Sequence, residues 1–289
     1  MVCQNNRSAE RHKLVKYDLD PSGYELEQGR VHIPCPPLAL NKNTGSTFAY
    51  GPEKFNILCK IPKPAFLAHK FDLLISDTAQ AELLARWSRF MKINPTAHNS
   101  GEASSARSTS AKSFHFGVWR RSSKQTFITK DTICQNEEQR KRLDEFLALV
   151  KDYVGVPVRS LMKRYANEEW EMRKVMWKHI KEKGIIQGRP VLDFNEAFTT
   201  LAVTNGVSDV VHTDRNDAGI TWVFPIGKWE GGDMCLNQTE RIIQVNPGDG
   251  IALQASFLAH RSTCLESGSR MALTCFVDHI DNTFLDAFE

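Results

Sequence analysis

The sequence has no run of eighteen apolar residues, so it contains no candidate transmembrane helix. The first residues, Met1–Arg7, lack the apolar core of a signal peptide, and we expect an intracellular protein without a membrane partner. No C-x-x-C occurs among the seven cysteines, which argues against a zinc ribbon, and their odd number argues against a disulfide framework. A Walker motif, G-x-G-x-x-G and G-x-S-x-G are also missing, which disfavours nucleotide-binding and α/β-hydrolase folds.

Charge is distributed unevenly, although the net charge of the 289 residues is only +3. The segment from Lys112 to Pro190 carries 18 Lys and Arg against 10 Asp and Glu, a surplus of 8. Such a basic segment is compatible with a polyanionic partner such as nucleic acid. On charge alone, the simpler explanation is the solvated surface of helices.

The local patterns divide the chain into an arm and one domain. Residues 1–53 show no sustained period and are predicted to form an extended arm. Residues 54–289 are predicted to form a single domain, of which 54–189 is mainly helical support and 190–289 is β-rich. Within the helical part, residues 94–113 are rich in Ser, Thr, Ala and Gly and are predicted to form a flexible loop.

Apolar residues at helical spacing predict three helices, over residues 77–92, 137–154 and 157–183. A strand is predicted at Phe114–Trp119. From Pro190 onward the pattern changes to short β-type runs separated by turn signals; the runs are 190–194, 198–204, 209–213, 220–225, 233–236, 241–245, 250–255 and 270–277. This spacing predicts an α+β fold, with a jelly-roll or barrel core and supporting N-terminal helices.

His212-Thr213-Asp214 forms an H-x-D triplet in this β-rich region. On a strand, residues i and i+2 point to the same face, so the imidazole and the carboxylate can converge on one ion. His260 can complete a set of two histidines and one carboxylate, which leaves three octahedral positions open and is typical of non-haem Fe(II) oxygenases. The triplet alone is weak evidence, because His279-Ile280-Asp281 repeats it without a downstream histidine.

Arg270 strengthens the interpretation, since it follows His260 at the start of the last long β-type run. An oxygenase that uses 2-oxoglutarate needs a cation for the distal carboxylate, and Arg offers two parallel hydrogen bonds. Turn signals at Gly231–Asp233 and Pro247–Asp249 lie between the candidate ligands. The joint pattern predicts a double-stranded β-helix oxygenase. The alternative is a cupin-like barrel whose histidines bind no metal.

The stretch from about Phe194 to Ile280 resembles the 2-oxoglutarate- and iron-dependent dioxygenases. Within them it is most similar to the Tet/J-binding-protein family, which oxidises methyl groups on DNA bases, and to the fungal members of that family. The residues that carry the resemblance are Asn205, His212-Thr213-Asp214-Arg215-Asn216-Asp217, Gly227-Lys228-Trp229-Glu230-Gly231-Gly232-Asp233, Pro247-Gly248-Asp249, His260 and Arg270, with Gly117-Val118-Trp119 and Ile128-Thr129 upstream.

The resemblance implies a role for each matching residue. His212, Asp214 and His260 would hold Fe(II), Arg270 would bind the cosubstrate 2-oxoglutarate, and O2 would be the second cosubstrate. Asn205 would contact 2-oxoglutarate. The implied partner is methylated duplex DNA whose target base is flipped into the site, so we expect a nuclear enzyme. We also expect it to be a monomer.

Two further positions resemble family positions near the target base. Asp217 lies three residues after Asp214, where a carboxylate could accept a hydrogen bond from the exocyclic amine of cytosine or adenine. The alternative for Asp217 is an Asx turn. His279 lies nine residues after Arg270, and its alternative is a surface histidine near the C-terminus. His115 and Trp119 could line the nucleic-acid side, and core packing explains them as well.

Three functions are compatible with these sequence features. The first is a DNA-modifying dioxygenase that acts as a demethylase on 5-methylcytosine, N6-methyladenine or both. The second is a protein hydroxylase of prolyl type or a small-molecule hydroxylase, which would use the same metal and cosubstrate residues. The third is a barrel that binds without catalysis, which the intact ligand set and Arg270 disfavour.

Overall fold

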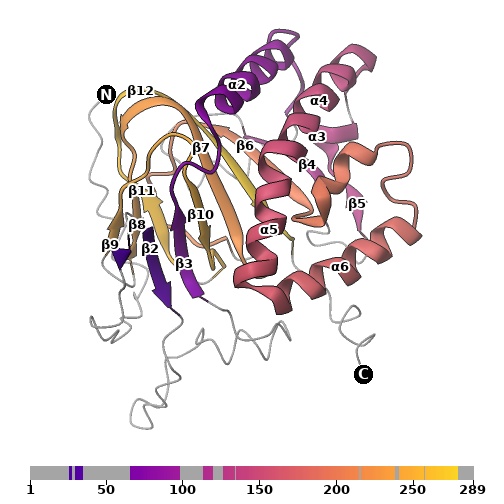
Figure 1. Ribbon diagram of the computed structural model, residues 1–289. Helices are drawn as coiled ribbons and strands as arrows, with labels where there is room; N and C mark the ends of the chain where they lie inside the picture. Colours follow the sequence, from indigo (N-terminus) through magenta and orange to yellow (C-terminus); the bar gives the residue numbers. More distant parts are fainter. Residues whose placement is uncertain are drawn as a thin grey trace.

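The structure is a computed structural model. It describes residues 26–27, 30–34, 66–97, 113–119, 126–133, 135–214, 216–237, 241–256 and 258–278. It contains two β-sheets, and helices cover the face of the larger sheet that is turned away from the smaller one (Figure 1). None of the helices in these ranges is long and apolar enough to cross a membrane.

The larger sheet has nine strands in the order β1-β2-β3-β10-β7-β12-β6-β4-β5, and the smaller has three in the order β11-β8-β9. Every strand pair is antiparallel. The bounds are β1 Leu26–Glu27, β2 Arg30–Pro34, β3 Phe66–Phe71, β4 Ser113–Trp119, β5 Phe127–Ile128, β6 Thr200–Asn205, β7 Thr221–Gly231, β8 Met234–Leu236, β9 Arg241–Ile243, β10 Gly250–Leu253, β11 His260–Ser262 and β12 Leu265–Phe276. This two-sheet, antiparallel arrangement confirms the predicted α+β fold with a double-stranded β-helix core.

The register of β12 separates two faces of the larger sheet. Arg270 donates a hydrogen bond to the carbonyl of Gly232, which precedes β8, so its side chain points toward the smaller sheet. Thr274 lies four residues further along β12 and shares that inner face. Met271 and Cys275 alternate with them, are buried, and point to the outer face that the helices cover. The inner face is therefore free to line a site between the sheets.

Helices cover the outer face, and aromatic side chains join them to the sheet (Figure 1). Trp87 of α2 packs against Phe114 of β4 at 5.4 Å and against Phe146 of α4 at 5.2 Å between ring centroids. Asn136 and Gln139 form a capping box that fixes the start of α4. The helical elements are α2 Asp77–Met91, α3 Lys130–Ile133, α4 Glu137–Val150, η4 Lys151–Gly155, α5 Val156–Tyr165, α6 Asn167–Glu182 and η5 Pro190–Glu196.

The predicted helix over 157–183 is wrong in one respect, because it is broken into α5 and α6. Ala166 between them has φ −146° and ψ 52°, outside the helical region. The break lets Trp170 of α6 pack beneath α5, where the side chains of Arg159 and Lys163 lie over its ring at 5.6 and 5.5 Å. Tertiary packing of a large aromatic here outweighs the local helical preference.

Two predicted strands are also wrong. Residues 190–194 form the 3-10 helix η5, in which Phe194 has a positive φ of 41° and a fully buried ring that stacks on Phe198. Residues 209–213 form no strand, and only His212 makes an isolated bridge. Both segments contain adjacent β-favouring apolar residues, Val191-Leu192 and Val210-Val211, but tertiary contacts determine the backbone.

The predicted arm is only partly described. Strand β2 lies in it and pairs with β3, so this part of the arm extends the larger sheet. The rest of residues 1–53, and residues 98–112 of the predicted loop, lie outside the described residues.

Cys235 and Cys275 are free and buried, whereas Cys264 forms a disulfide that the sequence did not predict.

Candidate metal centre

Three side chains meet between the sheets. The ligand atoms of His212, Asp214 and His260 all lie within 4.8 Å of one another. His212 Nε2 is 3.8 Å from one Asp214 oxygen, and His260 Nε2 is 3.6 Å from the other. No other group of three or more His, Cys, Asp or Glu in the described ranges has such spacing. Two imidazoles and one carboxylate form a donor set that suits a first-row transition metal such as Fe(II).

Backbone hydrogen bonds hold these ligands in place. His212 and His260 form a two-residue antiparallel bridge, with N–H···O distances of 3.1 and 2.9 Å. The N–H of Asp214 donates to the carbonyl of Ala255 at 2.9 Å. The predicted convergence of the H-x-D side chains is therefore present, but a single bridge and a loop produce it instead of a strand.

The other ring nitrogens select the tautomer of both histidines. His212 Nδ1 lies 2.8 Å from the carbonyl of Val210, and His260 Nδ1 lies 2.8 Å from that of Leu258. A carbonyl can only accept, so each Nδ1 carries the proton and each Nε2 lone pair faces Asp214. Burial lowers the pKa of His260, which also favours the neutral, metal-binding imidazole.

Arg270 is a buried cation whose nearest interacting carboxylate, on Asp233, lies beyond ion-pair distance. Its side chain is 5% exposed, donates to the Gly232 carbonyl at 2.7 Å and lies 5.6 Å above the Trp229 ring. Within the described residues it forms no ion pair, and its Nε has no hydrogen-bond partner. Burial lowers its pKa to about 10. Since a buried charge is costly unless it is paired, this site fits an acidic ligand.

Asn205 lies at the end of β6, close to Arg270 along the sheet. It pairs with Met271, so its side chain points to the outer face, and Asn205, Arg270 and Met271 all line a cavity of about 1050 Å³ next to α2. Thr204 lies one residue earlier and is the β6 residue on the inner face, opposite Ala272. Alternation along the strand places the side chains of Asn205 and Arg270 on opposite faces, and the contact of Asn205 with 2-oxoglutarate stays a prediction.

Asp217 does lie near the centre. It is 7% exposed, its Oδ2 accepts a hydrogen bond from Thr221 Oγ1 at 2.6 Å, and its backbone N–H donates to the Asp214 carbonyl at 2.9 Å. Burial and the nearby Asp214 carboxylate raise the pKa of Asp217 well above its ordinary value. It also forms an isolated bridge with Asp278, whereas His279 lies outside the described residues.

His115 lies on the inner face of the sheet. It pairs with Ala202, which pairs with Thr274, and Thr274 pairs with Val223 of β7. Directly paired residues point to the same face, so these side chains form one row across four strands. His115 also lies 5.4 Å from the Trp119 ring.

No protein-family model and no curated protein sequence matches the chain. Among solved structures, NgTET1 in complex with 5mC DNA matches with a TM-score of 0.52 and 13% identity, over 74% of this chain and 72% of that one. The chain has the fold of the 2-oxoglutarate- and Fe(II)-dependent oxygenases. Weaker matches include OsALKBH1 (TM-score 0.40, 13% identity, 75% and 98% covered) and a Pseudomonas putida prolyl-4-hydroxylase (0.40, 9%, 74% and 93%).

In an oxygenase of this fold the three ligands fit Fe(II), and the unneutralised guanidinium of Arg270 fits the 2-oxoglutarate carboxylate. A sequence identity of 13% supports the shared fold and nothing finer. The resemblance to fungal members therefore stays a prediction. Sequence reasoning missed the supporting residues Val210, Leu258 and Ala255, which contribute only backbone carbonyls. Because any residue type can supply a carbonyl, no sequence signal could have identified them.

Proposed function

We propose that this chain is a 2-oxoglutarate- and Fe(II)-dependent dioxygenase that oxidises methyl groups on DNA bases and so acts as a DNA demethylase in the nucleus. The chemistry rests on one observation: the cluster of His212, Asp214 and His260 lies between the same two sheets as the unneutralised Arg270. The substrate class is supported by the match to NgTET1, which was solved with 5mC DNA. Either 5-methylcytosine or N6-methyladenine is a candidate base.

Each residue has a distinct task in this proposal. With 2-oxoglutarate and O2, Fe(II) bound by the three ligands supplies the oxidising power for an otherwise inert methyl C–H bond. The carbonyls that accept from the two Nδ1 atoms orient the imidazoles so that each Nε2 is presented to the metal. Arg270 holds the distal carboxylate with its guanidinium, and its burial excludes water from that contact.

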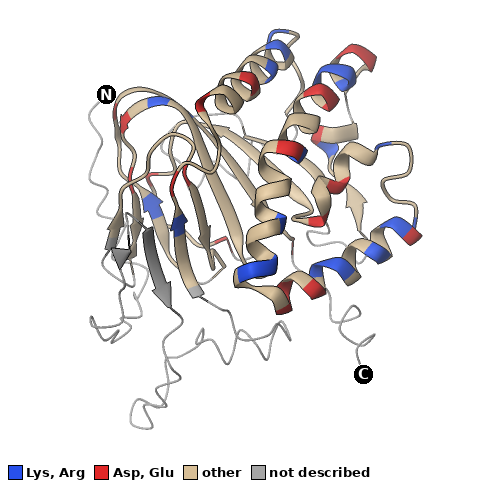
Figure 2. Cartoon of the chain, viewed as in Figure 1, with Lys and Arg blue, Asp and Glu red and all other residues tan. Residues whose placement is uncertain are grey.

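Binding to DNA requires cations that are free to contact phosphates. Figure 2 shows Lys and Arg on α5 without acidic residues, whereas α6 carries both signs of charge. On α6, Lys174 and Lys178 pair with neighbouring glutamates, but among the described residues no ion pair involves Arg159, Lys163 or Arg164 of α5. These α5 cations support a phosphate contact, whose affinity would fall steeply with salt. A base inside a duplex would have to be flipped out to reach the buried ligands.

A direct test offers the enzyme its candidate substrates side by side. Duplex DNA with 5-methylcytosine, duplex DNA with N6-methyladenine and a proline-containing peptide are each incubated with Fe(II), 2-oxoglutarate and O2. We expect succinate release to rise with at least one DNA and mass spectrometry to detect the oxidised nucleoside. Stimulation by the peptide alone would favour a protein hydroxylase. No stimulation by either DNA would overturn the proposed substrate.

Asp217 provides a sharper prediction for the DNA substrate. Asp217→Ala should reduce oxidation of the methylated base by about one to two orders of magnitude, because the exocyclic amine of the buried base would lose its hydrogen-bond partner, which costs roughly 1–3 kcal/mol. Low-level conversion of 2-oxoglutarate to succinate without base oxidation should persist. Asp217→Asn should be milder, since an amide can both donate and accept.

The two products are to be measured in parallel on the same DNA. Equal losses of succinate and of oxidised base would mean that Asp217 only shapes the turn that follows Asp214. No loss of either product would remove Asp217 from the site.

A further inference from the structure

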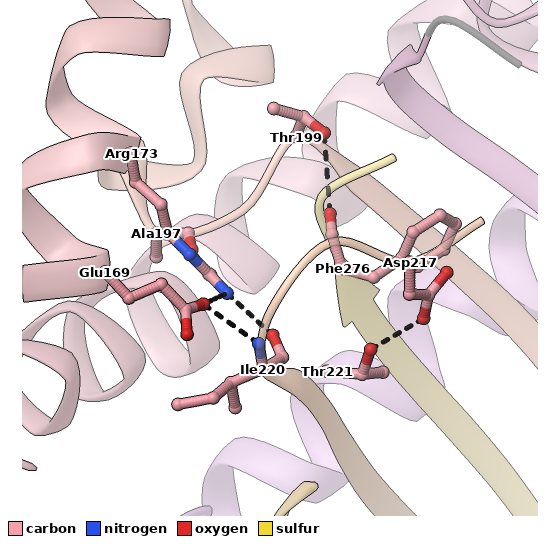
Figure 3. Close-up of polar contacts among 8 residues, drawn as sticks. All are labelled: Glu169, Arg173, Ala197, Thr199, Asp217, Ile220, Thr221 and Phe276. Atoms are coloured by element: carbon pink, nitrogen blue, oxygen red, sulfur yellow. Dashed lines mark hydrogen bonds and ion pairs between the residues drawn. The ribbon is translucent and has the colours of Figure 1, made fainter. Parts of the chain in front are cut away.

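A buried ion pair on α6 contacts the start of β7. Arg173 Nη2 lies 2.6 Å from Glu169 Oε1, and Arg173 is only 1% exposed. Figure 3 shows both side chains pointing from the helix toward Ile220. The pair lies outside the double-stranded β-helix and contributes no metal ligand. Burying an ion pair costs free energy unless both charges form good hydrogen bonds. The hydrogen bonds of this pair therefore identify the groups that it stabilises.

Those contacts are all to backbone at the end of the sheet. Arg173 donates to the Ile220 carbonyl at 2.6 Å and, through its other terminal nitrogen, to the carbonyl of Ala197. Glu169 Oε1 accepts the N–H of Ile220 at 2.9 Å. Both backbone groups of Ile220 are thereby held by the pair (Figure 3). One guanidinium spans the entries to β6 and β7, the two neighbours of β12.

From Ile220, a short series of contacts leads to the metal centre. The next residue, Thr221, donates its hydroxyl to Asp217 at 2.6 Å. The N–H of Asp217 in turn donates to the carbonyl of Asp214 at 2.9 Å. Ala218 between them donates to the carbonyl of Val277 at 2.8 Å. The segment Asp217–Thr221 is therefore tied at both ends, to Asp214 at one end and to the α6 pair at the β7 end.

Gly219 shows how closely the pair approaches this segment. Its φ is +69°, and a Cβ there would lie 2.4 Å from Glu169 Oε1. A side chain at this position would push Glu169 away from Ile220. Glycine thus allows the carboxylate to reach the backbone.

We propose that Glu169 and Arg173 are positioning residues that fix the segment Asp217–Thr221, and through it the metal ligand Asp214 and the substrate-side carboxyl of Asp217. This inference rests on the proposed function for the roles of those two residues. It makes the geometry of the site depend on a helix outside the barrel. Loss of the pair should therefore disturb metal binding more than a comparable loss elsewhere in the molecule.

Arg173→Lys is the first variant to test, and Arg189→Lys is its matched control. Lysine can reach one acceptor but cannot span Ile220 and Ala197. Arg189 likewise bonds a carboxylate, on Asp144, and a backbone carbonyl, on Thr132 at 2.9 Å. We expect Arg173→Lys to weaken Mn(II) binding about tenfold, as loss of groups that orient ligands commonly does. Arg189→Lys should leave Mn(II) affinity unchanged even where the melting temperature falls equally.

Hydrogen–deuterium exchange of the metal-free protein gives a readout that does not depend on activity. The amides of Asp217, Ala218 and Ile220 are all hydrogen-bonded in the structure. In Arg173→Lys we expect faster exchange at all three, whereas a merely local contact would expose Ile220 alone. Glu169→Gln keeps an acceptor for Ile220 and should have a smaller effect in the same direction.

Gly219→Ala tests the contact from the other side and avoids a buried unpaired charge on α6. Its control is Gly188→Ala, since Gly188 has a similar φ of +83° but open space around a Cβ. Only Gly219→Ala should weaken Mn(II) binding and speed exchange at Asp217. If both glycine variants behave alike, or if Arg173→Lys leaves Asp217 protected, the positioning role is wrong. A wild-type protein that binds no Mn(II) would overturn the proposed function, while the exchange data would still decide the positioning role.

Discussion

Asp214→Ala should abolish succinate formation and base oxidation together. Asp214 is the only carboxylate among the three ligands that meet within 4.8 Å, and its oxygens face the Nε2 atoms of both histidines. Without it, two neutral imidazoles would have to hold a divalent cation alone. His212→Ala and His260→Ala should have the same result, since each also removes one of three protein ligands. Mn(II) affinity, measured by calorimetry, should fall in step with turnover.

The matched control for the histidine variants is His179→Ala on α6, which lies outside the ligand group and should retain Mn(II) binding. Circular dichroism of each variant establishes that loss of turnover is not loss of fold. Near-normal turnover of Asp214→Ala with Fe(II) would show that the three residues do not form the metal site. The same result for His212→Ala alone would require a ligand from outside the described residues.

The metal ligands could be predicted because their chemistry restricts the residue types. Few side chains bind Fe(II), so His212, Asp214 and His260 are recognisable by type and spacing. How they converge could not be predicted. The local pattern indicates a strand at 209–213, while the structure uses one bridge to His260, a pairing with a partner far along the chain. Long-range pairing of this kind leaves no period in the sequence.

Asn205 shows the limit of a position taken from a motif. Side chains alternate along a strand, so one residue decides between the site and the helical face. The pairing of β6 with β12 places Asn205 opposite Met271 and brings Thr204 to the inner face with Arg270. Register depends on both strands, and a single strand read by itself does not define it.

Glu169 and Arg173 illustrate a different limit. In the sequence they form an i,i+4 pair of opposite charges, which is the pattern of an ordinary exposed helix surface. Only the packed structure shows that Arg173 is buried and that both groups contact Ile220. The break in the helix at Ala166 is a second feature that the sequence does not show. Because the chain turns there, α6 can pack against the sheet.

Arg270→Lys should weaken 2-oxoglutarate binding by about one to two orders of magnitude while Mn(II) binding persists. Lysine keeps the charge but cannot form two parallel hydrogen bonds, and each bond to a charged group contributes roughly 1.5–3 kcal/mol. Among the described residues the buried guanidinium forms no ion pair, and the carboxylate that acts on it, on Asp233, does so at longer range. Titration of 2-oxoglutarate into the Mn(II) protein measures the change directly.

Arg261→Lys is the control for this substitution. Arg261 lies between His260 and Ser262 on β11, and alternation turns its side chain away from the face that those two residues share. Its replacement should leave 2-oxoglutarate affinity unchanged. If Arg261→Lys weakens 2-oxoglutarate binding and Arg270→Lys does not, the carboxylate is held by Arg261. If Arg270→Lys instead loses Mn(II) and keeps 2-oxoglutarate, Arg270 supports the metal ligands through Ser262, whose hydroxyl lies 3.5 Å from its Nη1, and the cosubstrate needs another cation.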